Sequence, residues 1–181
     1  DDTTIMMRLA DVGPIPTESA REYAIAGPTV RGSDLAWDAR VDQPYSAYDQ
    51  LPVNVITHDG CDTLARTLVR IEEVFDSITQ IRAALSDMPD GEILNKIEEI
   101  PSGKEGICTV EAPRGEAIHY VLTGPNNRLD RWRVRAPTYQ NLQVVPVMIR
   151  GQQIADVPIS IGSLDPCFSC TERMELVDSN T

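Results

Sequence analysis

The chain has 181 residues, a formal net charge of −12 and a hydrophobic content of 41%. This length and composition predict one domain with a core that is mainly aliphatic, because only 5% of the residues are aromatic. The acidic balance argues against nucleic-acid binding, which depends on clustered lysine and arginine. The sequence contains neither a run of about eighteen apolar residues nor a basic-then-apolar leader, so it predicts no membrane span and no secretory signal.

The N-terminal third is predicted to hold little regular structure. Residues 1–16 are irregular and end in a Gly-Pro-Ile-Pro run. Thr17 followed by an acidic residue is typical of a helix start, and it predicts a short helix from Glu18 to Ala26. Residues 27–60 show little periodicity and many prolines and glycines, which favours an ordered loop that packs on a scaffold.

The clearest helix is predicted over residues 61–87. Apolar side chains recur there at spacings of three and four, at Leu64, Leu68, Ile71, Val74, Phe75, Ile78, Ile81 and Leu85. A helix of this length would extend roughly 40 Å, which is long for a domain of this size. We therefore expect one member of a larger bundle, with part of its apolar stripe left uncovered by this chain.

The C-terminal half begins with a strand pattern. Residues 116–135 alternate in character on either side of a turn at 123–127, which predicts a β-hairpin. A helix is expected from Tyr139 to Arg150, and the apolar run 154–164 fits either another helix or a buried extended segment. The predicted fold class is α+β, mainly helical, with one long helix and one β-hairpin.

The strongest local motif is a C-x-x-C pair near the C-terminus. Cys167 and Cys170 follow Asp165, whereas Cys61 and Cys108 are isolated in the sequence. Two thiolates three residues apart can bind one soft metal ion, and the carboxylate could orient a cation or take a proton. Half of a zinc site, a redox dithiol and a pair of buried thiols remain alternatives, although no second ligand pair and no βαβ pattern support the first two.

Two further segments flank the predicted hairpin. Pro113 and a glycine surround Arg114, a turn that would present a fixed guanidinium to an anionic ligand. The alternative is an ordinary turn arginine paired with a carboxylate. Pro137 and Thr138 follow the second strand, and the simpler explanation for them is a strand end followed by a threonine N-cap.

Together these segments resemble the C-terminal half of the large subunit of NiFe hydrogenases, especially the energy-converting, membrane-associated branch related to the quinone-site subunit of respiratory complex I. The resemblance extends from about Gly27 to Arg173. The supporting stretches are 27–33, 42–49, 68–73 and 155–157. Because the complex I relatives lack the cysteine pair, Cys167 and Cys170 favour the hydrogenase branch.

This resemblance implies a NiFe centre with cyanide and carbon monoxide ligands on the iron. Cys167 would be the terminal nickel ligand, and Cys170 would bridge nickel and iron. Arg114, with Pro113, would lie over the open face of the metals, and Asp165 would join it there. An iron-bound cyanide is an anionic acceptor that suits a guanidinium donor.

By the same resemblance, Pro137 and Thr138 would contact one cyanide. The family's other cysteine pair belongs to an N-terminal R-x-C-G-x-C motif that this sequence lacks, so this polypeptide alone cannot complete a four-thiolate site. Arg173 stands where many hydrogenases have histidine, and residues 174–181 form a tail that many relatives remove after nickel insertion.

The expected function is thus the C-terminal half of a hydrogenase catalytic subunit that reversibly oxidises dihydrogen and is inactive by itself. Its partners would be the N-terminal half of the large subunit, an iron–sulfur small subunit and membrane subunits, on the cytoplasmic face of the membrane. A complex-I-like quinone-site subunit is the first alternative, and a non-catalytic scaffold or unmatured fragment is the second.

Overall fold

A computed structural model describes residues 2–95 and 97–172. The N-terminal part contains short helices and the long helix: α1 (Thr3–Leu9), α2 (Thr17–Glu22), α3 (Pro28–Arg31), α4 (Ala39–Asp42) and α5 (Thr63–Ser86). A three-stranded sheet follows: β1 (Glu105–Ala112), β2 (Gly115–Thr123) and β3 (Leu129–Arg135). The chain then forms α6 (Pro137–Asn141), η1 (Leu142–Val144), α7 (Val145–Met148), η2 (Ile154–Asp156), α8 (Val157–Gly162) and α9 (Phe168–Thr171).

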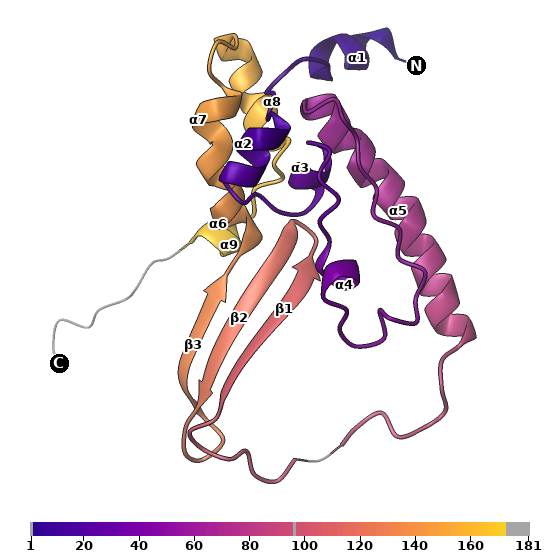
Figure 1. The fold of residues 1–181 in the computed structure, drawn as a ribbon, viewed down its shortest axis with the longest axis vertical. Helices are drawn as coiled ribbons and strands as arrows, with labels where there is room; N and C mark the ends of the chain where they lie inside the picture. The colour runs from indigo at the N-terminus through magenta and orange to yellow at the C-terminus, as the bar shows by residue number, and fades with distance from the viewer. Residues whose placement is uncertain (1, 96, 173–181) are drawn as a thin grey trace, which may run out of the picture.

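The sheet and the long helix lie on different sides of the molecule, joined by a long connection that precedes β1 (Figure 1). The predicted mixture of helices and sheet is confirmed, as is the long helix over 61–87. The predicted hairpin corresponds to β2 and β3, but β1 adds a third antiparallel strand that the sequence did not predict. The first half of β1 is exposed and its second half is partly buried, so its residues do not show the alternation that marks a half-buried strand.

Two helix predictions need correction at their boundaries, and the expectation that residues 1–16 are irregular is wrong because they contain α1. Helix α2 ends at Glu22 rather than Ala26, and Ala24 adopts a positive φ of 48°. The helix expected over 139–150 starts at Pro137 and is divided into α6, η1 and α7. Pro146, which has no N–H to donate, lies at this division. The run 154–164 is helical, forming η2 and α8.

The core is aliphatic, as expected, and it joins the N-terminal helices to the C-terminal ones. Its buried members are Ile15, Ala20, Ile25, Val30, Val144, Met148 and Leu164. None of the helices in the described parts of the chain is both long enough and apolar enough to cross a bilayer. The core therefore brings the start of the chain against the segment that leads to the C-x-x-C motif.

The long helix α5 buries mainly its polar side. Asp62 caps its first turn by accepting a hydrogen bond from the Ala65 N–H at 2.8 Å. Asp76 accepts hydrogen bonds from Asn54, at 2.7 Å, and from Gln80 on the same helix. Asn54 lies in the connection between α4 and α5, and part of this connection runs beside α5 (Figure 1).

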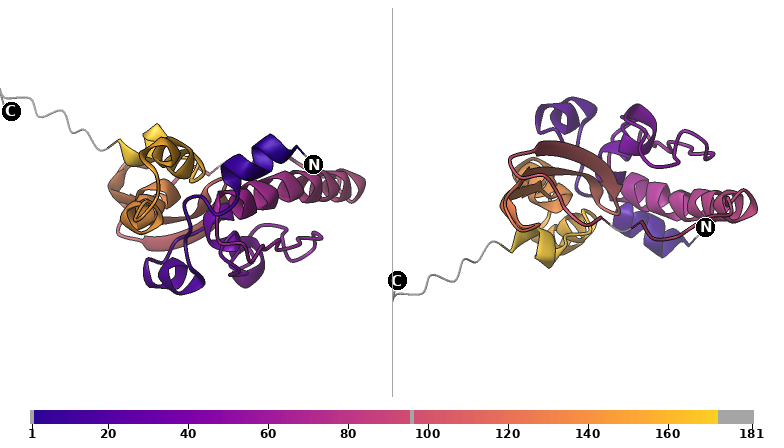
Figure 2. Two further views of the ribbon diagram at one scale, coloured as in Figure 1. Left: turned by 90° about the horizontal axis from the view of Figure 1, so that it is seen from above. Right: turned by 90° about the horizontal axis from the view of Figure 1, so that it is seen from below.

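The apolar stripe of α5 is largely exposed, as the sequence predicted. Ile71, Val74, Phe75, Ile78, Ile81 and Leu85 retain between 41% and 66% of their accessible surface. Figure 2 shows the helix extending away from the sheet and the C-terminal helices. This face therefore lacks a covering layer within the described part of the chain.

Candidate metal centre

The C-x-x-C motif lies at the start of α9, directly after the segment that leaves the core. Cys167 is the residue before the helix, and its carbonyl accepts a hydrogen bond from the Cys170 N–H at 3.1 Å. The Ser169 hydroxyl lies 3.0 Å from the Cys167 sulfur. Both thiols are partly exposed and free of disulfides.

The two thiols differ in acidity. The Ser169 hydroxyl, followed by the backbone N–H of Cys170, lowers the pKa of Cys167 to about 7. Burial is the main cause of a raised pKa at Cys170, although a hydrogen bond from Thr138 opposes it. Cys167 therefore ionises more readily than Cys170, and a thiolate is the form that binds metal.

Arg114 reaches the motif from the turn between β1 and β2. Its Nε lies 2.9 Å from Asp165 Oδ2 and 3.1 Å from the Asp165 carbonyl oxygen, and its Nη2 lies 3.1 Å from Oδ1. Asp165 has a positive φ of 53°, so its backbone is turned in a way that L-residues rarely adopt. Arg114 is thus a turn arginine paired with a carboxylate, and that carboxylate stands two residues before Cys167.

Thr138 reaches the same place from α6. The helix N-cap is Ala136, and Pro137 occupies the first turn, so the expectation of a threonine N-cap is wrong. Instead the Thr138 hydroxyl, which is only 1% exposed, accepts a hydrogen bond from the Cys167 N–H at 3.4 Å. Because the same side chain also acts to lower the pKa of Cys170, its influence extends to both cysteines of the motif.

A hollow of about 540 Å³ opens beside this group. Pro113 and Asp165 line its edge near the cysteines, and Arg70 and Glu73 of α5 line another part. Burial is the main cause of a lowered pKa at Arg70. From the sequence pattern alone, Arg70 and Glu73 would be expected on the solvent-facing side of an amphipathic helix. Their position outside the apolar stripe is the one signal that could have suggested a place beside the site.

The same hollow is bordered by a buried ionic cluster that the sequence pattern does not predict. Arg31, which is 2% exposed, lies 2.6 Å from Glu73, 3.0 Å from Glu111 and 3.3 Å from Asp38. Burial opposes ionisation of Asp38, but a hydrogen bond from Arg40 and the charge of Arg31 hold its pKa below the usual value. Burial outweighs Arg31 at Glu111 and raises the pKa of that carboxyl.

The other two cysteines lie away from the motif. Cys61 lies 3.8 Å from the Thr17 hydroxyl near the start of α5, and Cys108 is exposed on β1. Within residues 2–95 and 97–172, no three cysteine, histidine or carboxylate side chains are grouped so that they could hold a metal ion. Cys167 and Cys170 are therefore the two thiols that the described residues bring to this place. Arg173 and the tail 174–181 lie outside the described residues.

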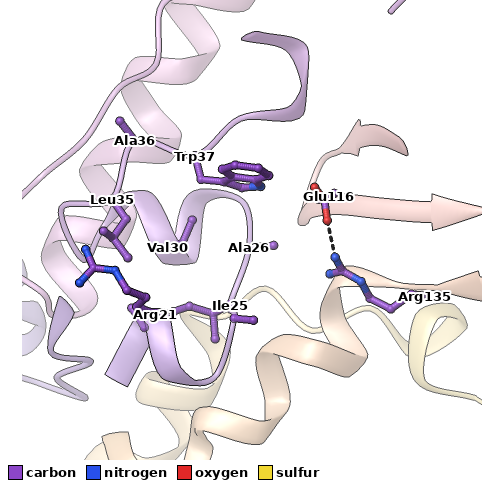
Figure 3. Close-up of a pocket in the computed structure, with 11 residues that line it drawn as sticks. Arg21, Ile25, Ala26, Val30, Leu35, Ala36, Trp37, Glu116 and Arg135 are labelled. Atoms are coloured by element: carbon purple, nitrogen blue, oxygen red, sulfur yellow. Dashed lines mark hydrogen bonds and ion pairs between the residues drawn. The ribbon is translucent and has the colours of Figure 1, made fainter. Parts of the chain in front are cut away.

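A second hollow, of about 390 Å³, is separate from the cysteines. Its wall is mostly apolar and includes Ile25 and Val30. Figure 3 shows Trp37 on one side and the ion pair between Glu116 and Arg135 on another. No cysteine lines this hollow, so it contributes no ligand to the candidate metal centre.

The family model for the 49-kDa subunit of respiratory-chain NADH dehydrogenase matches residues 1–106 and 97–173. The chain belongs to this family. Curated proteins that are similar to this chain include formate hydrogenlyase subunit 5 of Escherichia coli K12, which is 41% identical over 94% of this chain and 30% of its own length. The carbon monoxide-induced hydrogenase of Rhodospirillum rubrum is 39% identical over 94% of this chain and 47% of its own length.

Subunits of NADH-quinone oxidoreductases are also similar to this chain. An NADH-quinone oxidoreductase subunit of Solibacter usitatus is 37% identical over 87% of this chain and 43% of its own length. The chain thus spans less than half the length of each of these three relatives. The comparisons support the relationship to energy-converting hydrogenases and complex I that the sequence predicted.

Proposed function

We propose that this chain is the C-terminal part of the catalytic large subunit of an energy-converting NiFe hydrogenase. The observation that carries the proposal is the convergence of Arg114, Thr138 and Asp165 on the Cys167–Cys170 motif. These residues come from a strand turn, a helix and a loop that are far apart in sequence. A redox dithiol or two buried thiols would not require a guanidinium and a buried threonine beside them.

The chemistry of the donor set fits half of a NiFe centre. Cys167 and Cys170 would hold the metals as thiolates, which are suitable ligands for soft metals. Arg114 would donate hydrogen bonds to the anionic diatomic ligands of the iron while Asp165 holds its guanidinium in place. Pro137 and Thr138 would form the wall against one of those ligands. When bound, the centre supplies the reversible splitting of dihydrogen.

The remaining ligands and partners would come from outside this chain. We infer that the N-terminal half of the same large subunit provides the second cysteine pair and covers the apolar face of α5. An iron–sulfur small subunit would carry electrons, and membrane subunits would hold the assembly at the cytoplasmic face of the membrane. The isolated chain would be inactive because it has two of the four thiolates.

Elemental analysis of the full large subunit, co-expressed with its maturation proteins, tests this function. We expect nickel and iron in equal amounts, and loss of both after Cys170→Ser. Cys108→Ser is the matched control because Cys108 is an exposed thiol on β1, and this variant should retain both metals. A wild-type subunit without nickel that binds a short-chain quinone would favour the other branch, to which the Solibacter usitatus protein belongs.

A further inference from the structure

The turn that carries Arg114 is held by a buried amide from the neighbouring helix. Asn141, the last residue of α6, is completely buried. Its Oδ1 accepts a hydrogen bond from the Ala26 N–H at 2.9 Å, and its Nδ2 donates to the Ala26 carbonyl oxygen at 3.1 Å. The same Nδ2 donates to the Arg114 carbonyl oxygen at 3.3 Å. One carboxamide therefore ties the loop before α3 to the Arg114 turn.

Two glycines allow that loop and that turn to approach each other closely. A methyl group on Gly27 would lie 2.4 Å from the Arg114 carbonyl oxygen, and one on Gly115 would lie 2.5 Å from the Gly27 nitrogen. Both glycines have positive φ, 70° and 124°. The backbone of the turn thus lies directly against the loop, and Asn141 bonds to both sides of this contact.

The position of Asn141 in α6 links this contact to the cysteines. Asn141 follows Thr138 by three residues, so both project from the same side of the helix. Thr138 bonds the Cys167 N–H, while Asn141 bonds the Arg114 carbonyl oxygen. One short helix thereby fixes the separation between the cysteine motif and the arginine.

We propose that Asn141 is a positioning residue that sets where the Arg114 guanidinium lies over the metals. The inference rests on the proposed function. Asp165 holds the end of the Arg114 side chain, and Asn141 holds its backbone, so the guanidinium is restrained from both ends. Asn141 acts through Arg114 and would not itself touch the metals or their ligands.

The test uses the metal-loaded large subunit with Asn141→Ala. Gln140→Ala is a matched control, because Gln140 Nε2 donates to the Tyr23 carbonyl oxygen at 2.6 Å and so ties α6 to the N-terminal segment without bonding Arg114. Infrared bands of the iron-bound cyanides should shift in Asn141→Ala and stay unchanged in Gln140→Ala. Dihydrogen oxidation should fall by about 10- to 100-fold in Asn141→Ala alone, as is usual when a residue supporting a metal site is lost.

A double-mutant cycle separates positioning from general stability. In an Arg114→Ala background, Asn141→Ala should produce no further band shift. If Asn141→Ala fails to load metal, Asn141→Asp, which keeps the acceptor but cannot donate to the Arg114 carbonyl, takes its place. Unchanged bands in the loaded variants, or equal shifts in Gln140→Ala, would overturn the inference. A wild-type subunit with neither nickel nor cyanide bands would instead overturn the proposed function, and the inference with it.

Discussion

The exposed apolar face of α5 gives a prediction whose size follows from the structure. Phe75 and Leu85 are 66% and 65% exposed, so about one third of each side chain is already covered. Replacing both with glutamine preserves helix propensity and removes apolar surface from the exposed stripe. If the N-terminal half of the large subunit packs on this face, the double variant should weaken that association far more than it destabilises the chain.

Full burial of such a side chain is worth about 1.5–3 kcal/mol. The one third already covered corresponds to about 0.5–1 kcal/mol for each residue within the chain. The remaining two thirds would give about 1–2 kcal/mol for each on association, or about 2–4 kcal/mol for Phe75 and Leu85 together. That range corresponds to a roughly 30- to 700-fold weaker dissociation constant.

Calorimetric titration of this chain with the separately prepared N-terminal half measures the association, and urea unfolding measures the stability of the chain itself. Arg82→Gln is the control, since Arg82 is an exposed residue of α5 outside the stripe. Unchanged affinity in the double variant would refute the assignment of this face. A loss of chain stability as large as the loss of binding would show that the stripe already forms part of this chain's own core.

Three further outcomes are expected. Alkylation of Cys167 by iodoacetamide in the metal-free chain should follow a titration with a midpoint near pH 7, and Ser169→Ala should move that midpoint upward, since the hydroxyl is the main cause of the lowered pKa. Arg31→Met should lower the free energy of unfolding by about 3–5 kcal/mol in urea, because it leaves Glu73 and Glu111 without the cation that pairs with them, while Asp38 keeps Arg40; a loss below 1 kcal/mol would contradict this. Gly27→Ala should cost about 1–3 kcal/mol from its backbone conformation alone, measured by thermal unfolding, and a neutral result would show that the loop can move away from the Arg114 turn.

The stability contributed by the Arg31 cluster should also depend on pH. The folded-state pKa of Asp38 is lowered, so its contribution is present above the ordinary carboxyl pKa and is lost as the pH falls through the lowered value. Glu111 has a raised pKa, so its ionisation opposes folding as the pH rises. Acid unfolding of Asp38→Asn should therefore depend less on pH than that of the native chain, and an unchanged profile would contradict this assignment.

Periodicity was enough to predict the long helix and the β2–β3 hairpin, whereas the grouping of Arg114 and Thr138 at the cysteines was expected from the resemblance to the NiFe hydrogenases. Spacing of three and four along α5 is a local property, and so is the position of a proline or glycine beside an arginine. Strand β1 was missed because its pairing with β2 depends on register rather than on its own pattern. Its exposed first half and partly buried second half remove the alternation on which a sequence-based prediction depends.

The residues that support the site were also missed, and the reason differs from the reason for missing β1. Arg31 and Asn141 depend on partners as far as 80 and 115 positions away in the chain. An arginine in a proline- and glycine-rich segment looks solvent-exposed until the fold surrounds it with carboxylates. An asparagine near a helix end likewise suggests a cap, whereas here its amide joins two distant backbones.

The polar contacts of α5 explain why its apolar face is left uncovered by residues 2–95 and 97–172. A helix packed within a complete fold turns its apolar stripe towards the core. Here Asn54 bonds Asp76 on the covered side, and Arg66 is fully buried there with hydrogen bonds to Gly13 and Ser163. Rolling the helix to bury its stripe would break these bonds and leave buried polar groups without partners, at a cost of about 1–3 kcal/mol each. The rotation of α5 is therefore fixed by its polar side, and its apolar side faces away from the described part of the chain.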